Sequence, residues 1–444
     1  MKMIMMMKTN NALYFIGIKG SGMASLAQIC AKLGYEVSGS DTLDHVFTEE
    51  GLKALNIPLY KFDENNIKDH MTVVAGNAFF DDHLEVKKAL ENDTITFYRY
   101  HEFLGKIMED FRTITVSGSH GKTTTTTLLK DMLEKSVPTG FLIGDGHGEL
   151  TQDDTYFAVE ACEFKRHFLA YHPDVAILTN FEMDHVDYFK NEEDYLSSYQ
   201  EFIANVKEHI IIWGDDPNYD FFKIDIPFWT YGLSDKNDIQ AKNIIEHPNS
   251  TEFDLYFKGE NLKHFDLPIV GEHMVLNTLA VIGVGLYEKV SLEYIEEGLH
   301  NFKGAARRYV IQEVKDTVLI DDYAHNPTEI KLTLEVTRRR YPDKKLVAVY
   351  KPDRPSRIVY FIEELKDALS VADEVVFLPF PTLDSFESTV GIDVNYLKDR
   401  VENSIVIEDT LEGAQTLASL APGAFVFMST KNVYDIQEVL KELL

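Results

Sequence analysis

The stretch from Arg112 to Lys130, which reads RTITVSGSHGKTTTTTLLK, constrains this chain more than any other. A β-branched run over 113–116 predicts a buried strand, and a helical pattern begins at Lys122-Thr123. Between them lies a glycine-containing turn over 117–121, which we call the phosphate loop. Strand, loop, Lys-Thr and helix in this order are typical of a nucleotide phosphate site, in which amides and lysine bind the anion and the threonine hydroxyl can hold Mg²⁺. A plain glycine turn would not require Lys-Thr at this point.

The spacing of this motif is G-x-x-G-K-T, which is shorter than the common P-loop. Two further β-branched or apolar runs, 156–160 and 175–179, predict strands of the same domain. The first ends at Glu160, and His185 follows the second. The carboxyl ends of parallel strands meet at one edge of a sheet, where ligands bind. We therefore expect Glu160 and His185 beside the phosphate loop, as part of a second metal site, although either could be an ordinary loop residue.

A second glycine-rich turn lies near the start of the chain. The run 12–18 predicts a strand that enters GIKGSGM, an apolar helix follows over 24–33, and a second strand ends at Asp41. A βαβ unit with an acidic residue about 20 positions after the glycines is typical of nucleotide-binding folds. The glycine order is G-x-x-G-x-G and not the dinucleotide pattern, so this motif alone could mean only tight strand-to-helix packing.

The remaining 130 or so residues repeat the same alternation. Strands are predicted over 318–321, 346–350, 374–378 and 424–428, with helices over 329–340, 358–369, 395–401 and 411–420. A chain of 444 residues is long enough for two or three domains. The motifs predict an α/β protein of three domains, with bounds of 1–111, 112–312 and 313–444.

Composition excludes several kinds of partner. The formal net charge of -30 argues against nucleic acid and against anionic membrane surfaces. Two cysteines, Cys30 and Cys162, give no disulfide framework and fit a reducing compartment. The Met-rich start is too short an apolar run for a signal peptide, and no stretch of 18 apolar residues appears. We therefore expect a cytoplasmic protein that binds neither nucleic acid nor membrane.

Six motifs occur in the order found in the Mur ligases of peptidoglycan synthesis: SGSHGKTTTT, VEACE, TNFEMDH, EHMVLN, GAARRY and DDYAHNPTEI. With GIKGSGM, VSGSD and RYHEFL, the chain resembles this family over nearly its whole length, and most closely the members that join L-alanine to UDP-N-acetylmuramate. The resemblance implies an N-terminal Rossmann-like UDP-sugar domain, a central P-loop ATPase domain and a C-terminal Rossmann-like closing domain. We expect a monomer or homodimer.

The resemblance assigns roles to residues of this sequence. For ATP these are Gly118, Ser119, His120, Gly121, Lys122, Thr123, Thr124, Asn277, Arg308 and Asp322. The Mg²⁺ ligands would be Thr123, Glu160 and His185, and the catalytic residues Lys122, Glu160, His185 and His325. The UDP-sugar would lie against Gly20, Ser21, Gly22, Met23, Asp41 and Asn77, and the incoming amino acid against His325 and Arg357.

The implied chemistry begins with attack of the sugar carboxylate on the γ-phosphate of ATP, which gives an acyl phosphate and ADP. The amine of the amino acid then attacks the acyl carbon, which gives an amide and phosphate. The first step brings two anions together, so it needs the charge of lysine and of Mg²⁺.

Departures from the family pattern cluster in the third domain. The usual His-His-Pro is His325-Asn326-Pro327, the usual Phe-Gln-Pro-His is Tyr350-Lys351-Pro352-Asp353, and the late glycine-rich motif is Ser429-Thr430-Lys431-Asn432. These changes leave three alternatives open: a Mur-type ligase with another acceptor such as a muramyl peptide, a folylpolyglutamate-type ligase, and a non-catalytic UDP-sugar-binding paralogue. The N-terminal UDP-type motifs argue against the folate enzyme.

Overall fold

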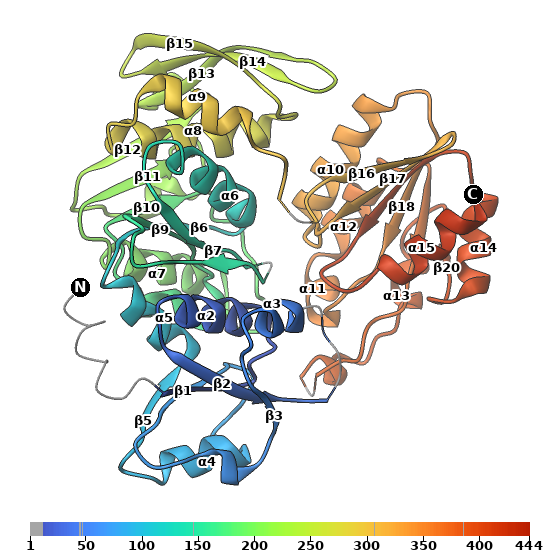
Figure 1. Ribbon diagram of the computed structural model, residues 1–444. Helices are drawn as coiled ribbons and strands as arrows, with labels where there is room; N and C mark the ends of the chain where they lie inside the picture. Colours follow the sequence, from blue (N-terminus) through green and yellow to red (C-terminus); the bar gives the residue numbers. More distant parts are fainter. Residues whose placement is uncertain (1–11, 44–45, 47, 145, 306, 385) are drawn as a thin grey trace. The chain divides into compact units, whose positions relative to one another are not determined.

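The computed structural model describes residues 12–43, 46, 48–144, 146–305, 307–384 and 386–444. Within these residues the chain forms three sheets. Figure 1 shows them, with colours that follow the sequence from blue to red. The chain divides into two compact units, and each is described by itself below. The first comprises residues 1–182 and 196–302, and the second comprises 183–195 and 303–444. None of the helices in the described part of the chain is long and apolar enough to cross a membrane.

The first sheet of unit 1 is parallel throughout and has the order β3-β2-β1-β4-β5. Its strands are β1 (Ala12–Ile16), β2 (Glu36–Asp41), β3 (Leu59–Lys61), β4 (Thr72–Ala75) and β5 (Thr96–Arg99). The helices between them are α2 (Ser21–Lys32), α3 (Glu49–Ala54), α4 (Leu84–Leu90) and α5 (Tyr100–Met108). Because β1 is central, its carboxyl end meets those of β2 and β4, and all three loops share one edge.

The second sheet of unit 1 has ten strands in the described residues, in the order β15-β14-β13-β12-β11-β10-β6-β9-β7-β8. They are β6 (Arg112–Ser117), β7 (Thr139–Leu142), β8 (Gly148–Glu149), β9 (Tyr156–Glu160), β10 (Val175–Leu178), β11 (His209–Trp213), β12 (Phe228–Gly232), β13 (Ile239–Glu246), β14 (Thr251–Phe257) and β15 (Glu260–Leu267). The run from β13 to β7 is parallel, and β14 and β15 add an antiparallel hairpin. Apolar side chains of β6, β9 and β10 point into one core and are almost fully buried.

Helices cover this sheet and complete its core. They are α6 (Lys122–Leu133), α7 (Glu192–Ile203), α8 (Glu272–Tyr287) and α9 (Leu292–His300), together with the 3₁₀ segment η3 (Phe164–Ala170). The apolar stripe Leu128, Leu129, Met132 and Leu133 of α6 is fully buried against the sheet. This stripe fixes α6 behind β6, so the turn between them is presented at the carboxyl edge.

The sheet of unit 2 has the order β16-β17-β21-β18-β19-β20 and is parallel except for the β16–β17 pair. Its strands are β16 (Val310–Val314), β17 (Thr317–Asp322), β18 (Leu346–Tyr350), β19 (Glu374–Phe377), β20 (Ser404–Val406) and β21 (Ala424–Met428). The helices are α10 (Pro327–Arg340), α11 (Pro355–Tyr360), α12 (Ile362–Leu369), α13 (Asn395–Lys398), α14 (Leu411–Ser419) and α15 (Tyr434–Leu443). Alternate residues of the central strands enter two separate apolar cores, so both faces of this sheet are covered.

The α/β class and the parallel sheets confirm the fold class predicted from the sequence. Two helices differ from the prediction. The helix predicted over 395–401 ends at Lys398, and the segment 358–369 is two helices, α11 and α12, which meet at Phe361. Phe361 has φ -107 and ψ 26, outside the helical range, and its ring is almost fully buried. The apolar periodicity continues through the break because both helices face the same core.

Candidate active site

The phosphate loop joins β6 to the N-terminus of α6, as its sequence predicts. Gly118 has φ 140 and Gly121 has φ 80, and both values are strained for any residue with a Cβ. A Cβ on Gly118 would also lie 2.0 Å from the Thr179 hydroxyl oxygen. The loop can therefore form only with glycine at both positions, and it leaves the amides at the start of α6 at the sheet edge.

Lys122 is held inside this loop by its own backbone. Its ammonium donates to the carbonyl oxygens of Gly118 at 2.5 Å and Ser119 at 3.0 Å. It also forms an ion pair with Glu163 at 3.1 Å. Burial works to lower the pKa of Lys122, but the Glu163 and Glu160 carboxylates outweigh it and raise that pKa well above its ordinary value. The lysine is therefore a fixed positive charge at the loop.

Thr123, in the first turn of α6, meets Glu160, at the end of β9. The Thr123 hydroxyl donates to a Glu160 carboxylate oxygen at 3.0 Å, and the Gly144 amide donates to the same oxygen at 2.9 Å. A hydroxyl and a carboxylate oxygen in contact are a donor set that Mg²⁺ accepts in phosphate sites. The two residues predicted as metal ligands in unit 1 thus lie together.

The end of β10 clamps the phosphate loop from its other side. Asn180 accepts from the amides of Ser119 at 3.0 Å and His120 at 2.9 Å, through its carbonyl and its side chain. The Thr179 hydroxyl donates to the His120 carbonyl at 2.7 Å, and His120 lies 3.1 Å from Glu182. These contacts were not predicted from the sequence, which gives only a strand that ends at residue 179. The feature that could have predicted these contacts is the position of β10 in the sheet, because it pairs directly with β6.

Asn277 of α8 also lies at this loop. A Cβ on Gly121 would come within 2.9 Å of the Asn277 side-chain oxygen, so the two residues are in contact. Thr124, in the first turn of α6, and Asn277 are both buried. The ATP residues predicted in unit 1 are therefore gathered around one turn of chain, while Arg308 and Asp322 belong to unit 2.

The glycine turn after β1 is fixed by Asp41, at the end of β2. The two Asp41 carboxylate oxygens accept from the amides of Lys19 and Thr42, each at 2.7 Å. The Lys19 ammonium donates to the Thr42 carbonyl at 2.8 Å and pairs with Glu49 at 2.5 Å. The amide end of α2 begins in this turn, at Ser21. The predicted UDP-sugar residues Gly20, Ser21, Gly22, Met23 and Asp41 are thus contiguous, and Asn77 follows the adjacent strand β4.

Unit 2 contains a second group of predicted residues, centred on Arg357. This side chain is only 4% exposed, and its guanidinium bonds Asp184 and Asp353, each at 3.0 Å. Burial opposes the charge, but the two carboxylates raise the pKa of Arg357 above its ordinary value. Asp353 replaces the family's histidine, and Thr430, from another altered motif, donates to it at 2.9 Å. Two of the departures seen in the sequence therefore contact each other.

His325 and Asp322 lie beside this cluster on the loop between β17 and α10. The His325 Nδ1 donates to the Tyr323 carbonyl at 3.0 Å, and its Nε2 lies 4.0 Å from Asp184. Burial lowers the pKa of His325, whereas burial raises the pKa of Asp322 to about 6. His185 follows Asp184 in unit 2, so its predicted role as a ligand to the same metal as Glu160 stays a prediction.

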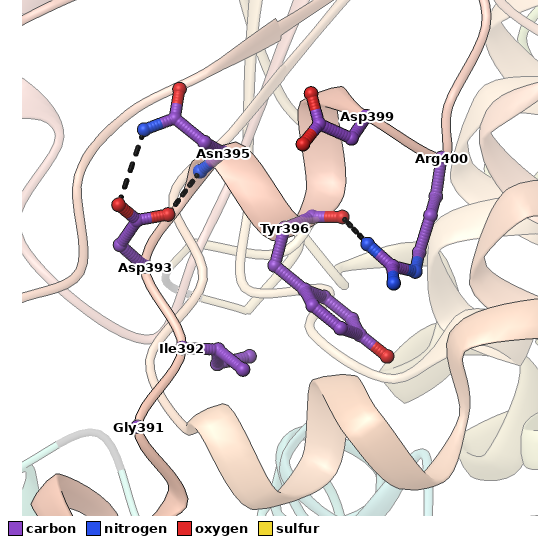
Figure 2. A pocket seen from close by; sticks show the side chains of 7 residues that line it. All are labelled: Gly391, Ile392, Asp393, Asn395, Tyr396, Asp399 and Arg400. Carbon is purple, nitrogen blue, oxygen red and sulfur yellow. Dashed lines mark hydrogen bonds between the residues drawn. The ribbon is translucent and has the colours of Figure 1, made fainter.

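A surface hollow of about 510 Å³ lies beside α13 in unit 2, and Figure 2 shows the seven residues that line it. Arg400 lies over the Tyr396 ring, with its guanidinium carbon 3.7 Å from the ring centre, and donates to the Tyr396 carbonyl at 3.0 Å. Asp393 accepts from the Asn395 amide at 2.9 Å. These contacts are local, and none of the seven lining residues has a predicted role in the reaction.

Models of three protein-family domains match the chain. They are "Mur ligase family, catalytic domain" over residues 12–112, "Mur ligase middle domain" over 116–285 and "Mur ligase, glutamate ligase domain" over 306–432. Together they cover most of the chain.

Curated relatives match over the full length. The chain is 43% identical to the UDP-N-acetylmuramate–L-alanine ligase of Lactiplantibacillus plantarum, over 97% of this chain and 98% of that protein. It is 41% identical to the corresponding ligase of Lacticaseibacillus paracasei, over 98% and 99% of the two chains. The same fold occurs in the UDP-N-acetylmuramate–alanine ligase of Thermotoga maritima (TM-score 0.77, 23% identity, 97% and 98% coverage). It also occurs in a murein peptide ligase of Psychrobacter arcticus (TM-score 0.72, 23% identity, 97% and 98% coverage).

Proposed function

This chain belongs to the Mur ligase family, and we propose that it joins L-alanine to UDP-N-acetylmuramate at the expense of ATP. The observation that carries this proposal is the full-length identity of 43% to a ligase of that name, with the phosphate-loop residues in contact with one another. The reaction forms a carbon–nitrogen bond and belongs to the synthesis of peptidoglycan precursors.

The residues of unit 1 fit ATP and Mg²⁺. Lys122 and the amides of the phosphate loop would bind the outer phosphates, Thr123 would hold one Mg²⁺, and Glu160 and His185 would hold a second. Bound Mg²⁺ would supply positive charge at the transferring phosphoryl group. Lys122 is oriented by two carbonyls, so its charge needs little rearrangement as the reaction proceeds. Asn277, Arg308 and Asp322 would contact the rest of the nucleotide.

The sugar carboxylate attacks the γ-phosphorus, ADP leaves, and an acyl phosphate remains. The amine of L-alanine then attacks the acyl carbon, and phosphate leaves with formation of the amide. The glycine turn at Gly20–Met23, with Asp41 and Asn77, would hold the UDP-sugar. His325 and Arg357 would face the amino acid. Because Arg357 is already bonded to Asp184 and Asp353, its contact with an α-carboxylate would be shared with these groups.

We place the reaction in the cytoplasm, where ATP is abundant, and expect a monomer or homodimer. Cys30 is buried and Cys162 is exposed, and the two are not bonded, which suits a reducing compartment.

The test is ADP release by the purified full chain in the presence of UDP-N-acetylmuramate, with and without L-alanine. We expect release to depend on both compounds. Release that needs a muramyl peptide in place of L-alanine would favour a peptide ligase, and tight binding of the UDP-sugar without ADP release would favour a non-catalytic paralogue.

A further inference from the structure

Asn77, His101 and His167 form a hydrogen-bonded group that we call the imidazole cluster. Asn77 follows β4, His101 is the second residue of α5, and His167 lies in η3 of the ATP-binding part of unit 1. The Asn77 side-chain oxygen is 3.1 Å from His101 Nδ1, and the Asn77 side-chain nitrogen is 3.1 Å from His167 Nδ1. The two rings stack, with centres 4.3 Å apart and an angle of 21° between their planes.

The chemistry of the amide fixes the protonation of this cluster. One end of the Asn77 amide only accepts a hydrogen bond and the other end only donates one. The ring that faces the oxygen must therefore carry a proton on Nδ1, and the ring that faces the nitrogen must present an unprotonated Nδ1. Turning the amide over exchanges the two rings but leaves the requirement unchanged. One imidazole must be neutral, and the two rings must differ at Nδ1.

The surroundings of the rings favour the neutral forms. Burial lowers the pKa of His167 to about 4, with His101 and Lys165 acting in the same direction. Burial also lowers the pKa of His101; Arg99 adds to this effect and Glu102 opposes it. The Lys165 ammonium lies 5.6 Å from the centre of the Phe80 ring, and the Phe164 ring meets the edge of His167. Close stacking of two imidazolium rings would add repulsion between like charges.

The cluster joins the two sheets of unit 1 at their candidate sites. On one side, Tyr100 packs against Gly22 of the glycine turn, where a Cβ would lie 2.9 Å from the tyrosine ring. On the other side, α5 packs against η3, where a Cβ on Gly105 would lie 2.4 Å from the Ala170 carbonyl. The segment η3 begins four residues after Glu160, at the end of β9. The cluster thus links the edge of the first sheet to η3, the segment that follows Glu160 in the chain.

We propose that Asn77, His101 and His167 are positioning residues, which hold the UDP-sugar site in register with the phosphate loop through a hydrogen-bonded pair of unlike imidazole tautomers. The sugar carboxylate must reach the γ-phosphate, and the rate of such a transfer depends steeply on the alignment of the two groups. The kinetic part of this proposal rests on the proposed function, because it takes UDP-N-acetylmuramate as the aligned substrate.

Replacement of His167 separates positioning from a simple structural role. His167→Ala removes the acceptor for the Asn77 amide, whereas His167→Asn keeps an acceptor at the position of Nδ1 and removes the titratable ring. We expect His167→Ala to lower kcat about fivefold, as for the loss of one neutral hydrogen bond, with KM for ATP within about twofold of the wild type. His167→Asn should restore most of kcat. His172→Ala, at an exposed histidine five residues away, is the matched control and should match the wild type.

A second measurement does not depend on turnover. Nitrogen-15 spectra of the histidine-labelled full chain, assigned with His101→Asn and His167→Asn, report which ring nitrogen carries the proton. We expect one ring of the pair to carry a proton on Nδ1, and the other ring to be neutral at pH 6 with its proton on Nε2. These spectra test the structural part of the proposal whether or not the wild type uses L-alanine. Failure to use L-alanine would count against the proposed function alone.

Three results would overturn the proposal. The first is the same tautomer in both rings, and the second is an imidazolium form of both rings at pH 6. The third is a His167→Ala enzyme with unchanged kcat, or one whose loss of kcat is equally large in His167→Asn.

Discussion

At the scale of single residues, the environment of Lys122 explains what this side chain can do. Two carbonyl oxygens of its own loop and the Glu163 carboxylate surround the ammonium group, which stays charged at all physiological pH values. A charge that is already oriented stabilises developing negative charge at little reorganisation cost. The carbonyl contacts also explain why the sequence has Lys at this position and not Arg, because the compact ammonium fits between them.

We expect Lys122→Ala to reduce turnover by at least about 10²-fold, as for loss of an electrostatic group at the reacting centre, while UDP-N-acetylmuramate still binds. Steady-state rates and calorimetric titration with the UDP-sugar measure the two effects. Lys130→Ala, in the same helix, is the control, because that lysine pairs with Asp131 and Glu134 and lies over the Phe141 ring, away from the phosphate loop. Near-normal turnover of Lys122→Ala would remove the phosphate-loop assignment.

Glu160 has a different kind of environment, since its contacts are with a hydroxyl and an amide. We expect Glu160→Ala and, separately, His185→Ala to lower the rate strongly, and excess Mg²⁺ to restore part of it where the defect is metal affinity. Rates measured over a range of Mg²⁺ concentrations test this, with the exposed Glu149 changed to Ala as the control. An unchanged rate and Mg²⁺ dependence at either position would place the second metal elsewhere.

At the scale of elements, the strand order brings together what the sequence separates. β10, β6 and β9 are adjacent, so the loops after them meet although they are spread over some 70 residues. This adjacency could be predicted from the motifs, because parallel strands of an α/β sheet present their carboxyl ends together. The contacts of Thr179 and Glu182 with the phosphate loop could not, since they depend on the exact path of the chain after β10.

The elements missed by the sequence are those without a strong pattern. β16 is half exposed and has polar residues at its centre, and it is a strand because it pairs antiparallel with β17 at the sheet edge. α15 was not predicted either, and its buried face of Ile436, Gln437 and Leu440 is short. The break between α11 and α12 was missed for the opposite reason, because apolar spacing continues through it. Local pattern identifies buried elements well and edge or terminal elements poorly.

The phosphate loop should tolerate no side chain at its first glycine. We expect Gly118→Ala to abolish ATP turnover, because a Cβ would lie 2.0 Å from the Thr179 hydroxyl and φ is 140. Gly259→Ala is the matched control: this glycine has φ 84 in the β14–β15 turn, with no atom within 4 Å of the added Cβ. Gly259→Ala should lower the free energy of unfolding by about 1 kcal/mol and leave kcat unchanged. Turnover in Gly118→Ala close to that of the control would show that the loop is not held as described.

A buried histidine at β11 should make folding sensitive to acid. His209 is 3% exposed and stacks on Tyr287 with ring centres 4.2 Å apart, and burial lowers its pKa to about 4. The unfolded chain therefore binds more protons between pH 6.5 and 4, so this group's contribution to stability is present above pH 6.5 and is lost as the pH falls. At pH 5.5 the free energy of unfolding is lower by about 1.4 kcal/mol than at neutral pH because of this group.

We expect His209→Phe to lose about 1.4 kcal/mol less stability than the wild type between pH 7.5 and pH 5.5, because phenylalanine keeps the stacking but does not titrate. Urea unfolding of both proteins at the two pH values measures this difference. Equal acid sensitivity of the variant and the wild type would mean that His209 is not neutral in the folded protein.

At the scale of the whole molecule, the three α/β sheets and the three matched family domains account for the fold class and for the family predicted from the sequence. The glycine turn after β1 and the phosphate loop lie in unit 1, whereas His325, Arg357 and the altered third-domain motifs lie in unit 2. The sequence predicted these groups separately from short motifs. It could not predict that Asp353 and Thr430 contact each other, because they come from different loops 77 residues apart.

The Asp353–Arg357–Asp184 cluster contains one of the motifs that depart from the family pattern, and the choice of amino acid is therefore the part of the reaction that most needs a test. An additional buried carboxylate beside the arginine would favour a polar or cationic amino acid if it faced the acceptor. We still expect L-alanine, because relatives that are more than 40% identical over the full chain carry that name. Discrimination against glycine and L-serine should be modest, since one methylene in an apolar pocket is worth only about 1–3 kcal/mol.

The most direct test of the account supplies UDP-N-acetylmuramate, ATP and Mg²⁺ with each common amino acid in turn and identifies the product by mass. We expect the highest rate with L-alanine, lower rates with glycine and L-serine, and one ADP released for each amide formed. A charged amino acid or a preformed peptide as the best acceptor, or no product with any amino acid, would contradict it.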